Sequence, residues 1–301
     1  SYEVDPLNPN YSSLNGVFTD KTQKIIYAVP PSLPECVSTK TYVIPSSVTE
    51  ISGLFTFAYF GSNLLSITIP PTLKIISGGS IFNTAFFTSI TIPGTVVLNG
   101  FGIFQNCRQL TSITIGSGIK SLPGQLLTGT NKLTSVTFQS PVQVTSIGYR
   151  CFLESLSLTS IDIPDSVTLI EWSAFKGCTL LTSVNFSPTS MLTTITALAS
   201  DGAFQNCGLT QITLPNGVSY IQGYTFANSK LTSITIPPSI TRIGYAAFQY
   251  IYPLTEVIFS SGPGNILPKI NRIDGNAFAY ATNLTSITIP NSVTLIESQA
   301  L

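Results

Sequence analysis

A seven-residue pattern of apolar and polar positions, Leu-Thr-Ser-Ile-Thr-Ile-Pro at residues 284–290, recurs about ten times from Leu64 onward. Its Ile-x-Ile alternation predicts a strand with one buried face. The first Ile-like position returns after 23, 23, 23, 25, 23, 28, 22, 23 and 30 residues, and an earlier, worn copy ends at Ile44 and Pro45. The copies are at Ile67, Ile90, Ile113, Val136, Ile161, Val184, Ile212, Ile234, Val257 and Ile287.

Each repeat carries a second apolar segment, Val-Thr-x-Ile-x-x-x-Ala-Phe, as in Val167, Ile170, Ala174 and Phe175. Proline closes many of the first strands because it has no N–H with which to continue a ladder. One repeat cannot bury its own apolar side chains, but stacked repeats bury the same position of every copy against the next. The pattern therefore predicts a stack of short coils.

The combined motif, Leu-x-x-Ile-x-Ile-Pro-x-x-Val-x-x-Ile-x-x-x-Ala-Phe-x-x-Cys-x-x-Leu, resembles the BspA-type leucine-rich repeat, also called the Treponema pallidum class, over roughly residues 37–301. The resemblance implies a mostly β, right-handed solenoid with a parallel sheet on its concave face and short strands and turns on its convex side. Members are typically bacterial or protozoan surface proteins that contact host matrix proteins or other cells. The family offers no catalytic residues to transfer to this chain.

Two domains are expected. Residues 1–34 do not fit the repeat, and residues 16–21 followed by 24–29 predict a β-hairpin, which we interpret as an N-terminal cap. Residues 35–301 form the solenoid of about eleven repeats of ~23 residues. The chain stops at Ala300 and Leu301, where the repeat has Ala-Phe, so we expect either a continuation of the protein or an open last coil.

The composition excludes several classes of function. Only 9% of the 301 residues are charged and the net charge is zero, which argues against a nucleic-acid partner. Histidine is absent, which removes His-based catalysis and His metal sites, and no phosphate-loop, dinucleotide or Gly-x-Ser-x-Gly motif occurs. The sequence contains no run of 18 apolar residues, so it predicts no membrane span. We expect no enzyme, no cofactor and no bound metal.

The five cysteines are interpreted as small buried thiols. Cys107, Cys178 and Cys207 share one repeat position, and a disulfide between the neighbouring Cys178 and Cys207 is the alternative. Residues 51–153 carry five cations and no acid, which reads as scattered solubilising charge or, alternatively, as a weak site for an anionic partner. These cations are Lys74, Arg108, Lys120, Lys132 and Arg150.

The outward columns of the first strands are the candidate binding surface. They read mostly Ser in one column and Thr in the other, and stacking would make two hydroxyl ladders with a spacing of about 4.8 Å. Strand propensity and solubility alone could account for both columns. As a contact surface, the columns would be most selective where they break, at Asp162 with Asn185 and at Glu256 with Ile258. The full candidate set is Ser112, Thr114, Ser135, Thr137, Asp162, Asn185, Thr213, Thr235, Glu256 and Ile258.

Three longer repeats end their first strand in Phe, at Phe138, Phe186 and Phe259, with extra residues directly after it. A further insertion spans residues 196–202. Insertions in one column emerge on one edge of a solenoid, which is often a binding edge, although drift in loop length is the alternative. Aromatic residues share or adjoin one position of the second segment and are expected either to cluster as a contact site or to pack over the corner. They are Tyr149, Trp172, Tyr224 and Tyr245.

These observations favour a non-enzymatic extracellular or cell-surface protein that binds a host or matrix protein through its solenoid surface. A self-assembling structural protein is the first alternative, because solenoid ends are open sheet edges. A glycan- or lattice-binding module is the second. The protein is expected to be a monomer or to associate end to end. Asn-x-Ser/Thr sequons at Asn10, Asn185 and Asn283 would accept glycans in a eukaryotic secretory pathway.

Overall fold

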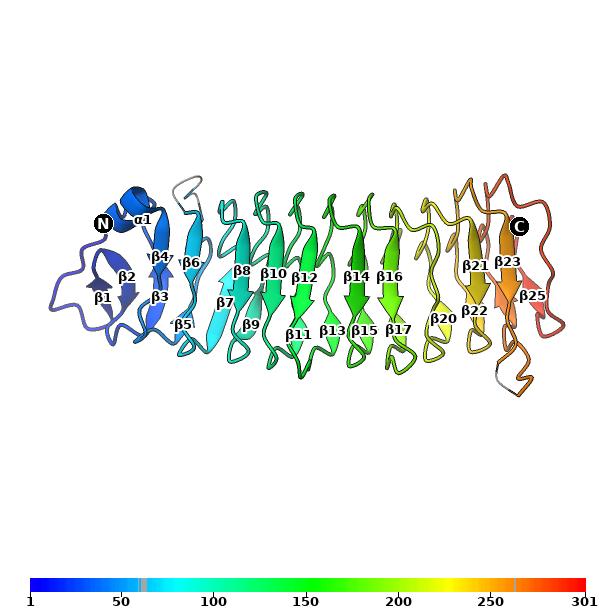
Figure 1. The fold of residues 1–301 in the computed structure, drawn as a ribbon, viewed down its shortest axis with the longest axis horizontal. Coiled ribbons are helices and arrows are strands. Elements are labelled where there is room, and N and C mark those ends of the chain that lie inside the picture. The colour runs from blue at the N-terminus through cyan, green and yellow to red at the C-terminus, as the bar shows by residue number, and fades with distance from the viewer. Residues whose placement is uncertain (59, 61–63, 263) are drawn as a thin grey trace. The chain divides into compact units, whose positions relative to one another are not determined.

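The computed structural model describes residues 1–58, 60, 64–262 and 264–301, and it divides into two units, Ser1–Val144 and Thr145–Leu301. Both units are mostly β structure. The described residues hold one short α-helix, α1 (Pro34–Thr39), and strands of two to five residues. In each unit the strands alternate between two rows, the first and the second strands of the repeat (Figure 1). Each unit is therefore a solenoid segment, as the repeat predicted.

Unit 1 opens with an antiparallel meander of β1 (Tyr11–Leu14), β2 (Val17–Asp20) and β3 (Ile25–Ala28). The β2–β3 pair confirms the predicted hairpin, whereas β1 was not predicted. The Asp20 carboxylate closes the β2–β3 turn by accepting the N–H groups of Lys24 and Ile25, each at 2.7 Å. Strand β3 then pairs in parallel with β5, so the hairpin is continuous with the row of second strands. Its role as a cap stays a prediction.

The first strands of unit 1 pair in parallel with identical repeat positions opposite one another. Ile113 lies opposite Ile90 on one side and Val136 on the other. Strands β6 and β8 belong to separate sheets, so the first row is not continuous even here. The first strands are β4 (Thr41–Val43), β6 (Ser66–Thr68), β8 (Ser89–Ile92), β10 (Ser112–Ile115) and β12 (Ser135–Phe138). The second strands are β5 (Glu50–Ile51), β7 (Ile75–Gly79), β9 (Val97–Phe101) and β11 (Ser121–Leu122).

Unit 2 repeats this plan with shorter second strands. Its first strands are β14 (Ser160–Ile163), β16 (Ser183–Phe186), β21 (Ser233–Ile236) and β23 (Glu256–Phe259). Its second strands are β13 (Ser146–Ile147), β15 (Leu169–Ile170), β17 (Thr194–Ile195), β20 (Tyr220–Ile221), β22 (Arg242–Ile243), β24 (Arg272–Ile273) and β25 (Leu295–Ile296). The insertion at residues 196–202 forms a small antiparallel pair, β18 (Ala197–Leu198) with β19 (Asp201–Gly202).

The core of each unit contains a column of stacked phenylalanines from the Ala-Phe position. In unit 2 consecutive rings lie 5.0–5.6 Å apart and within 15° of parallel. This column comprises Phe152, Phe175, Phe204, Phe226, Phe248 and Phe278. In unit 1, Phe57, Phe82 and Phe104 stack at 5.0 and 5.1 Å. All nine rings are at most 2% exposed, which is how stacking removes from water what a single coil could not.

The cysteines are free and buried, which confirms the thiol interpretation and leaves no disulfide between Cys178 and Cys207. Each repeat-position thiol donates to the carbonyl of the Phe one coil earlier, as Cys178 Sγ does to the Phe152 oxygen at 3.1 Å. Burial raises the pKa of the Cys178 thiol to about 12. These side chains therefore pack as protonated small groups.

The structure shows a role for the threonine of the Leu-Thr-Ser motif, which the sequence analysis did not assign. Its hydroxyl and its N–H both donate to the carbonyl of the same threonine one coil earlier. The hydroxyl of Thr111 reaches the Thr88 oxygen at 2.9 Å, and that of Thr255 reaches the Thr232 oxygen at 3.0 Å. A threonine here therefore joins successive coils. This column was not recognised as structural from the sequence.

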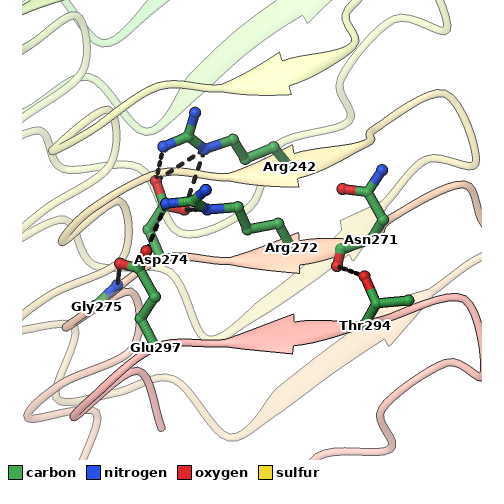
Figure 2. A network of polar contacts seen from close by, with 7 residues as sticks. All are labelled: Arg242, Asn271, Arg272, Asp274, Gly275, Thr294 and Glu297. Carbon is green, nitrogen blue, oxygen red and sulfur yellow. Dashed lines mark hydrogen bonds and ion pairs between the residues drawn. The ribbon is translucent and has the colours of Figure 1, made fainter.

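The second strands of unit 2 are held by ion pairs in addition to backbone bonds (Figure 2). Asp274, whose side chain is 4% exposed, accepts hydrogen bonds from Arg242 at 2.6 Å and from Arg272 at 2.7 Å. Arg272 also contacts Glu297 at 2.5 Å, and Glu297 accepts the N–H of Gly275 at 2.9 Å. Two cations and two carboxylates thus neutralise one another across β22, β24 and β25.

Candidate functional site: the first-strand face

The predicted ladders are present on the outward side of the first strands, and we call this surface the first-strand face. In unit 1, Ser112 lies opposite Ser135 and Thr114 opposite Thr137, in direct parallel register. Ser135 and Thr137 are exposed, and Ser112 and Thr114 are half-buried. These four candidate residues therefore lie together. They carry no charge, so the surface offers only hydroxyl groups and backbone.

In unit 2 the first break in the ladder is a fixed polar pair. Asp162 and Asn185 are opposite each other on β14 and β16, and the Asn185 amide donates to the Asp162 carboxylate at 2.7 Å. The Ser183 hydroxyl donates to the other end of the same amide, at 2.6 Å from Oδ1. Asn185 is exposed but held at both ends. The pair thus presents a preset orientation of amide and carboxylate to solvent.

The second break adds an apolar side chain. Thr235 lies between Thr213 and Ile258, and Glu256 lies opposite Ser233. Ile258 is 42% exposed, and Glu256 is also exposed. Within unit 2 the structure therefore forms two groups of candidate residues, Asp162 with Asn185 and Glu256 with Ile258, Thr235 and Thr213.

Two predicted first strands of unit 2 are not formed, and this corrects the sequence analysis. Residues 211–214 make only a single bridge, from Thr213 to Thr235. Residues 286–289, the pattern from which the repeat was defined, contain no strand. These two segments follow the longest intervals, 28 and 30 residues, and each comes after a strand that ends in Phe. The added residues separate the coil from its predecessor, so the ladder stops at β16 and again at β23.

The threonine column is interrupted at the same two places. Thr182, Thr232 and Thr255 each donate an N–H to the preceding threonine carbonyl. Among the described residues, none donates a hydrogen bond to the carbonyls of Thr182 or Thr255, which Thr210 and Thr285 would otherwise reach. The carbonyls of Phe186 and Phe259 also accept no hydrogen bond from a described residue. In an unbroken pair the Ile236 carbonyl accepts the N–H of Ser260 at 3.0 Å, but the residues equivalent to Ser260 at the interruptions, Pro215 and Pro290, have no N–H.

A groove lies at each interruption. The first runs along β16 and has residues 211–213 as its opposite wall, with a volume of about 260 Å³. It shares Phe186 and Thr213 with an adjoining hollow of about 360 Å³ that Pro215 and Pro237 also line. The second runs along the whole of β23, with Thr288 and Pro290 opposite, and measures about 420 Å³. Candidate residues Asn185, Thr213, Thr235, Glu256 and Ile258 line these grooves.

The insertion after Phe186 is anchored beside the first groove. The hydroxyls of Ser187 and Thr189 donate to the carboxylate of Asp165, which follows β14. These two hydrogen bonds lower the pKa of Asp165. Asp162 and Asp165, which flank the end of one strand, therefore serve different partners and do not form a carboxylate pair.

The predicted aromatic group separates into two pairs. Tyr149 and Trp172 stack at 5.0 Å, with the Arg150 guanidinium 4.7 Å from the Trp172 ring centre, and Tyr224 packs edge-on against Tyr245 at 5.7 Å. Arg150 also pairs with Asp201 at 3.3 Å, so one of the five cations of residues 51–153 is neutralised by an acid from outside that stretch. Burial raises the pKa of Asp201, but the bond and charge of Lys176, followed by those of Arg150, outweigh it and leave the pKa lowered.

Comparison with known proteins identifies the repeat. The model of the BspA type leucine rich repeat region matches residues 32–152, 100–199, 145–262 and 190–301, and so covers almost all of the solenoid. The chain belongs to the BspA-type leucine-rich repeat family. None of the curated proteins compared with this BspA-type chain matches it. Among the described residues, no helix is long and apolar enough to span a membrane, and no three acids or cysteines gather in a metal-binding group.

Two solved structures with TM-scores above 0.5 share the fold. A leucine-rich repeat protein of Bacteroides ovatus aligns over 96% of this chain and 82% of its own, with 19% identity and a TM-score of 0.59. A leucine rich cell surface protein of Faecalibacterium prausnitzii aligns over 97% and 84%, with 22% identity and a TM-score of 0.51. The chain covers 50% of a leucine-rich repeat protein of Eubacterium ventriosum, at 21% identity and a TM-score of 0.46.

Proposed function

We propose that this BspA-type protein is a non-enzymatic adhesion or recognition protein, located outside the cell or on its surface, that binds a protein partner through the first-strand face. The observation that carries the proposal is the face itself. It is exposed, almost uncharged and periodic, and it is interrupted by fixed side chains such as Asn185 and by two grooves in unit 2. The family repeat and the cell-surface description of the Faecalibacterium prausnitzii protein support the location.

The buried thiols of the repeat position and two of the carboxylates are engaged in structural contacts. The buried thiols donate to carbonyls, and the carboxylates of Asp274 and Asp201 neutralise cations. A large open surface with few charges suits recognition of another macromolecule, in which complementarity depends on shape and hydrogen bonds. We therefore expect binding without turnover.

The test is a binding measurement with the 301-residue chain on immobilised extracellular matrix proteins and mucins. A variant carrying Asp162→Ala, Asn185→Ala, Glu256→Ala and Ile258→Ala should bind at least about tenfold more weakly, since truncation of even one hot-spot residue costs about 2 kcal/mol or more. The control carries Lys24→Ala, Lys40→Ala and Thr72→Ala, which are exposed and lie off the first strands. Equal losses in both variants, or binding to none of these proteins, would contradict the proposal.

Two other results would favour the alternatives. Growth of the sedimentation coefficient with protein concentration, with no binding to matrix proteins, would indicate self-assembly. Saturable binding to purified polysaccharide that the first-strand variant abolishes would indicate a glycan-binding module.

A further inference from the structure

The interruptions in the first row expose strand edges in the middle of a unit rather than at its end. In the unbroken pairs, the acceptors that face the next coil come from every second residue, as the bonds to the Thr111 and Ile115 carbonyls show. The equivalent residues of β16 are Thr182, Val184 and Phe186. No described residue donates to their outward carbonyls. An edge of this kind is a template for another strand.

The second interruption has the same construction. The equivalent residues of β23 are Thr255, Val257 and Phe259, and the groove along them is lined by Ile258 and by Pro268 of the insertion. The neighbouring insertion residues Ile266 and Leu267 are 50% and 63% exposed. Apolar side chains therefore stand exposed near an edge of hydrogen-bond acceptors.

The spacing of these acceptors selects the kind of ligand. An extended polypeptide presents an N–H on a given side at every second residue, roughly 6.6–6.8 Å apart, which is the repeat of outward carbonyls along a strand. Sugar hydroxyls have no such period. We propose that the two grooves bind extended peptide segments of a partner protein by strand addition, with main-chain bonds to the β16 and β23 edges.

The charges on the first-strand face indicate which peptide sequences would bind best. In the two outward columns of the first strands the charged residues are Asp162 and Glu256, both acidic, and neither column contains Lys or Arg. Asp162 is bonded to Asn185, which lines the first groove, and Glu256 lines the second. The preferred segment is consequently one with Lys or Arg beside apolar residues, and its binding weakens as salt rises.

This inference rests on the proposed function and names its contact. The first experiment selects from a displayed library of random seven-residue peptides on the full chain, then measures the dissociation constant of the selected peptide with one backbone N–H methylated at a time. Methylation at alternate residues should raise the constant at least tenfold, whereas methylation between them should change it less than threefold. A uniform response, or none, would overturn strand addition.

A variant that fills the first groove tests whether the peptide binds there. Thr213→Trp puts a large ring into the first groove, and the matched control is Thr91→Trp, an exposed strand threonine opposite Thr114 in an unbroken pair. Thr213→Trp should reduce binding of a peptide specific to this groove at least tenfold and leave thermal unfolding close to that of the control. Equal binding by both variants would overturn the assignment to this groove. If matrix proteins bind and lose affinity only through Asp162 or Ile258 side chains, strand addition fails while the proposed function stands.

Discussion

The first rows of the two units use one consensus but differ in continuity. In unit 1, β8, β10 and β12 follow one another at 23 residues and form one ladder. In unit 2, intervals of 28 and 30 residues leave residues 211–214 and 286–289 outside any strand, although their sequences match the consensus closely. A local pattern therefore specifies the strand's faces, while the length of chain between copies affects whether the strand finds its neighbour.

The phenylalanine column continues across the first interruption, although the second row is broken there, where β17 and β20 belong to separate sheets. Between the coil of β16 and the coil of residues 211–214 the Phe204 and Phe226 rings still stack at 5.6 Å, and across the 30-residue interval β24 and β25 remain paired. The core thus holds the coils together at the first interruption, and at the second interruption the pairing of β24 with β25 does so. A normal interval does not guarantee pairing either, because β6 and β8 are 23 residues apart in register and lie in separate sheets.

The largest predicted effect tests whether the core is continuous across an interrupted coil. Phe204→Ala removes a fully buried ring that stacks between Phe175 and Phe226, and it should cost about 3–5 kcal/mol of unfolding free energy, from lost burial and the cavity left behind. Phe104→Ala is the control in an unbroken ladder, where the ring is equally buried. Urea unfolding measures both. If Phe204→Ala costs less than half as much as Phe104→Ala, the interrupted coil is loosely packed and the comparison fails.

A deletion should convert the second interrupted ladder of unit 2 into a continuous one. Deleting residues 261–267 restores the interval between Val257 and Ile287 from 30 to 23 residues. Residues 286–289 should then pair with β23 and add two or three backbone hydrogen bonds, worth about 1–4.5 kcal/mol in total.

Hydrogen exchange measures the result of this deletion, through new protection of the amides of Ser286 and Thr288. The second groove should disappear with it, and peptide binding there should be lost. Unchanged exchange in a folded protein would show that interval length is not what interrupts this ladder.

These cases mark how far the sequence was informative. Periodicity was sufficient to predict the solenoid, the register of Ile113 with Ile90 and the burial of Cys178, because each depends on the same position meeting itself in the next coil. The grooves were out of reach, since Ser286 and Thr288 occupy correct consensus positions and only their failure to pair reveals an open edge. The insertions after Phe186 and Phe259 were the feature of the sequence that could have indicated the grooves.

A smaller effect separates paired from unpaired threonines. Thr255→Val removes a hydroxyl that donates to the Thr232 carbonyl at 3.0 Å, while Thr285 has no partner in the equivalent place among the described residues. We expect Thr255→Val to cost about 0.5–1.5 kcal/mol, the usual net value of one hydrogen bond. Thr285→Val, with nothing to lose, should stay near zero. Equal costs in urea unfolding would remove the threonine column as a source of cohesion between coils.

The smallest effect concerns pH and distinguishes the two insertions. Hydrogen bonds from Ser187 and Thr189 lower the folded-state pKa of Asp165, so the contact stabilises the folded chain above the ordinary aspartate pKa of about 3.9. That stabilisation is lost as pH falls through the lowered, folded-state pKa. Acidification should therefore release the insertion after Phe186, seen as an upfield shift of the Thr189 amide resonance in NMR spectra with a midpoint below 3.9, whereas Asp165→Asn should remove that transition. The insertion after Phe259 has no such carboxylate contact among its described residues and should show no transition in this range. A shared transition would mean that the acid response belongs to the whole unit rather than to the Asp165 anchor.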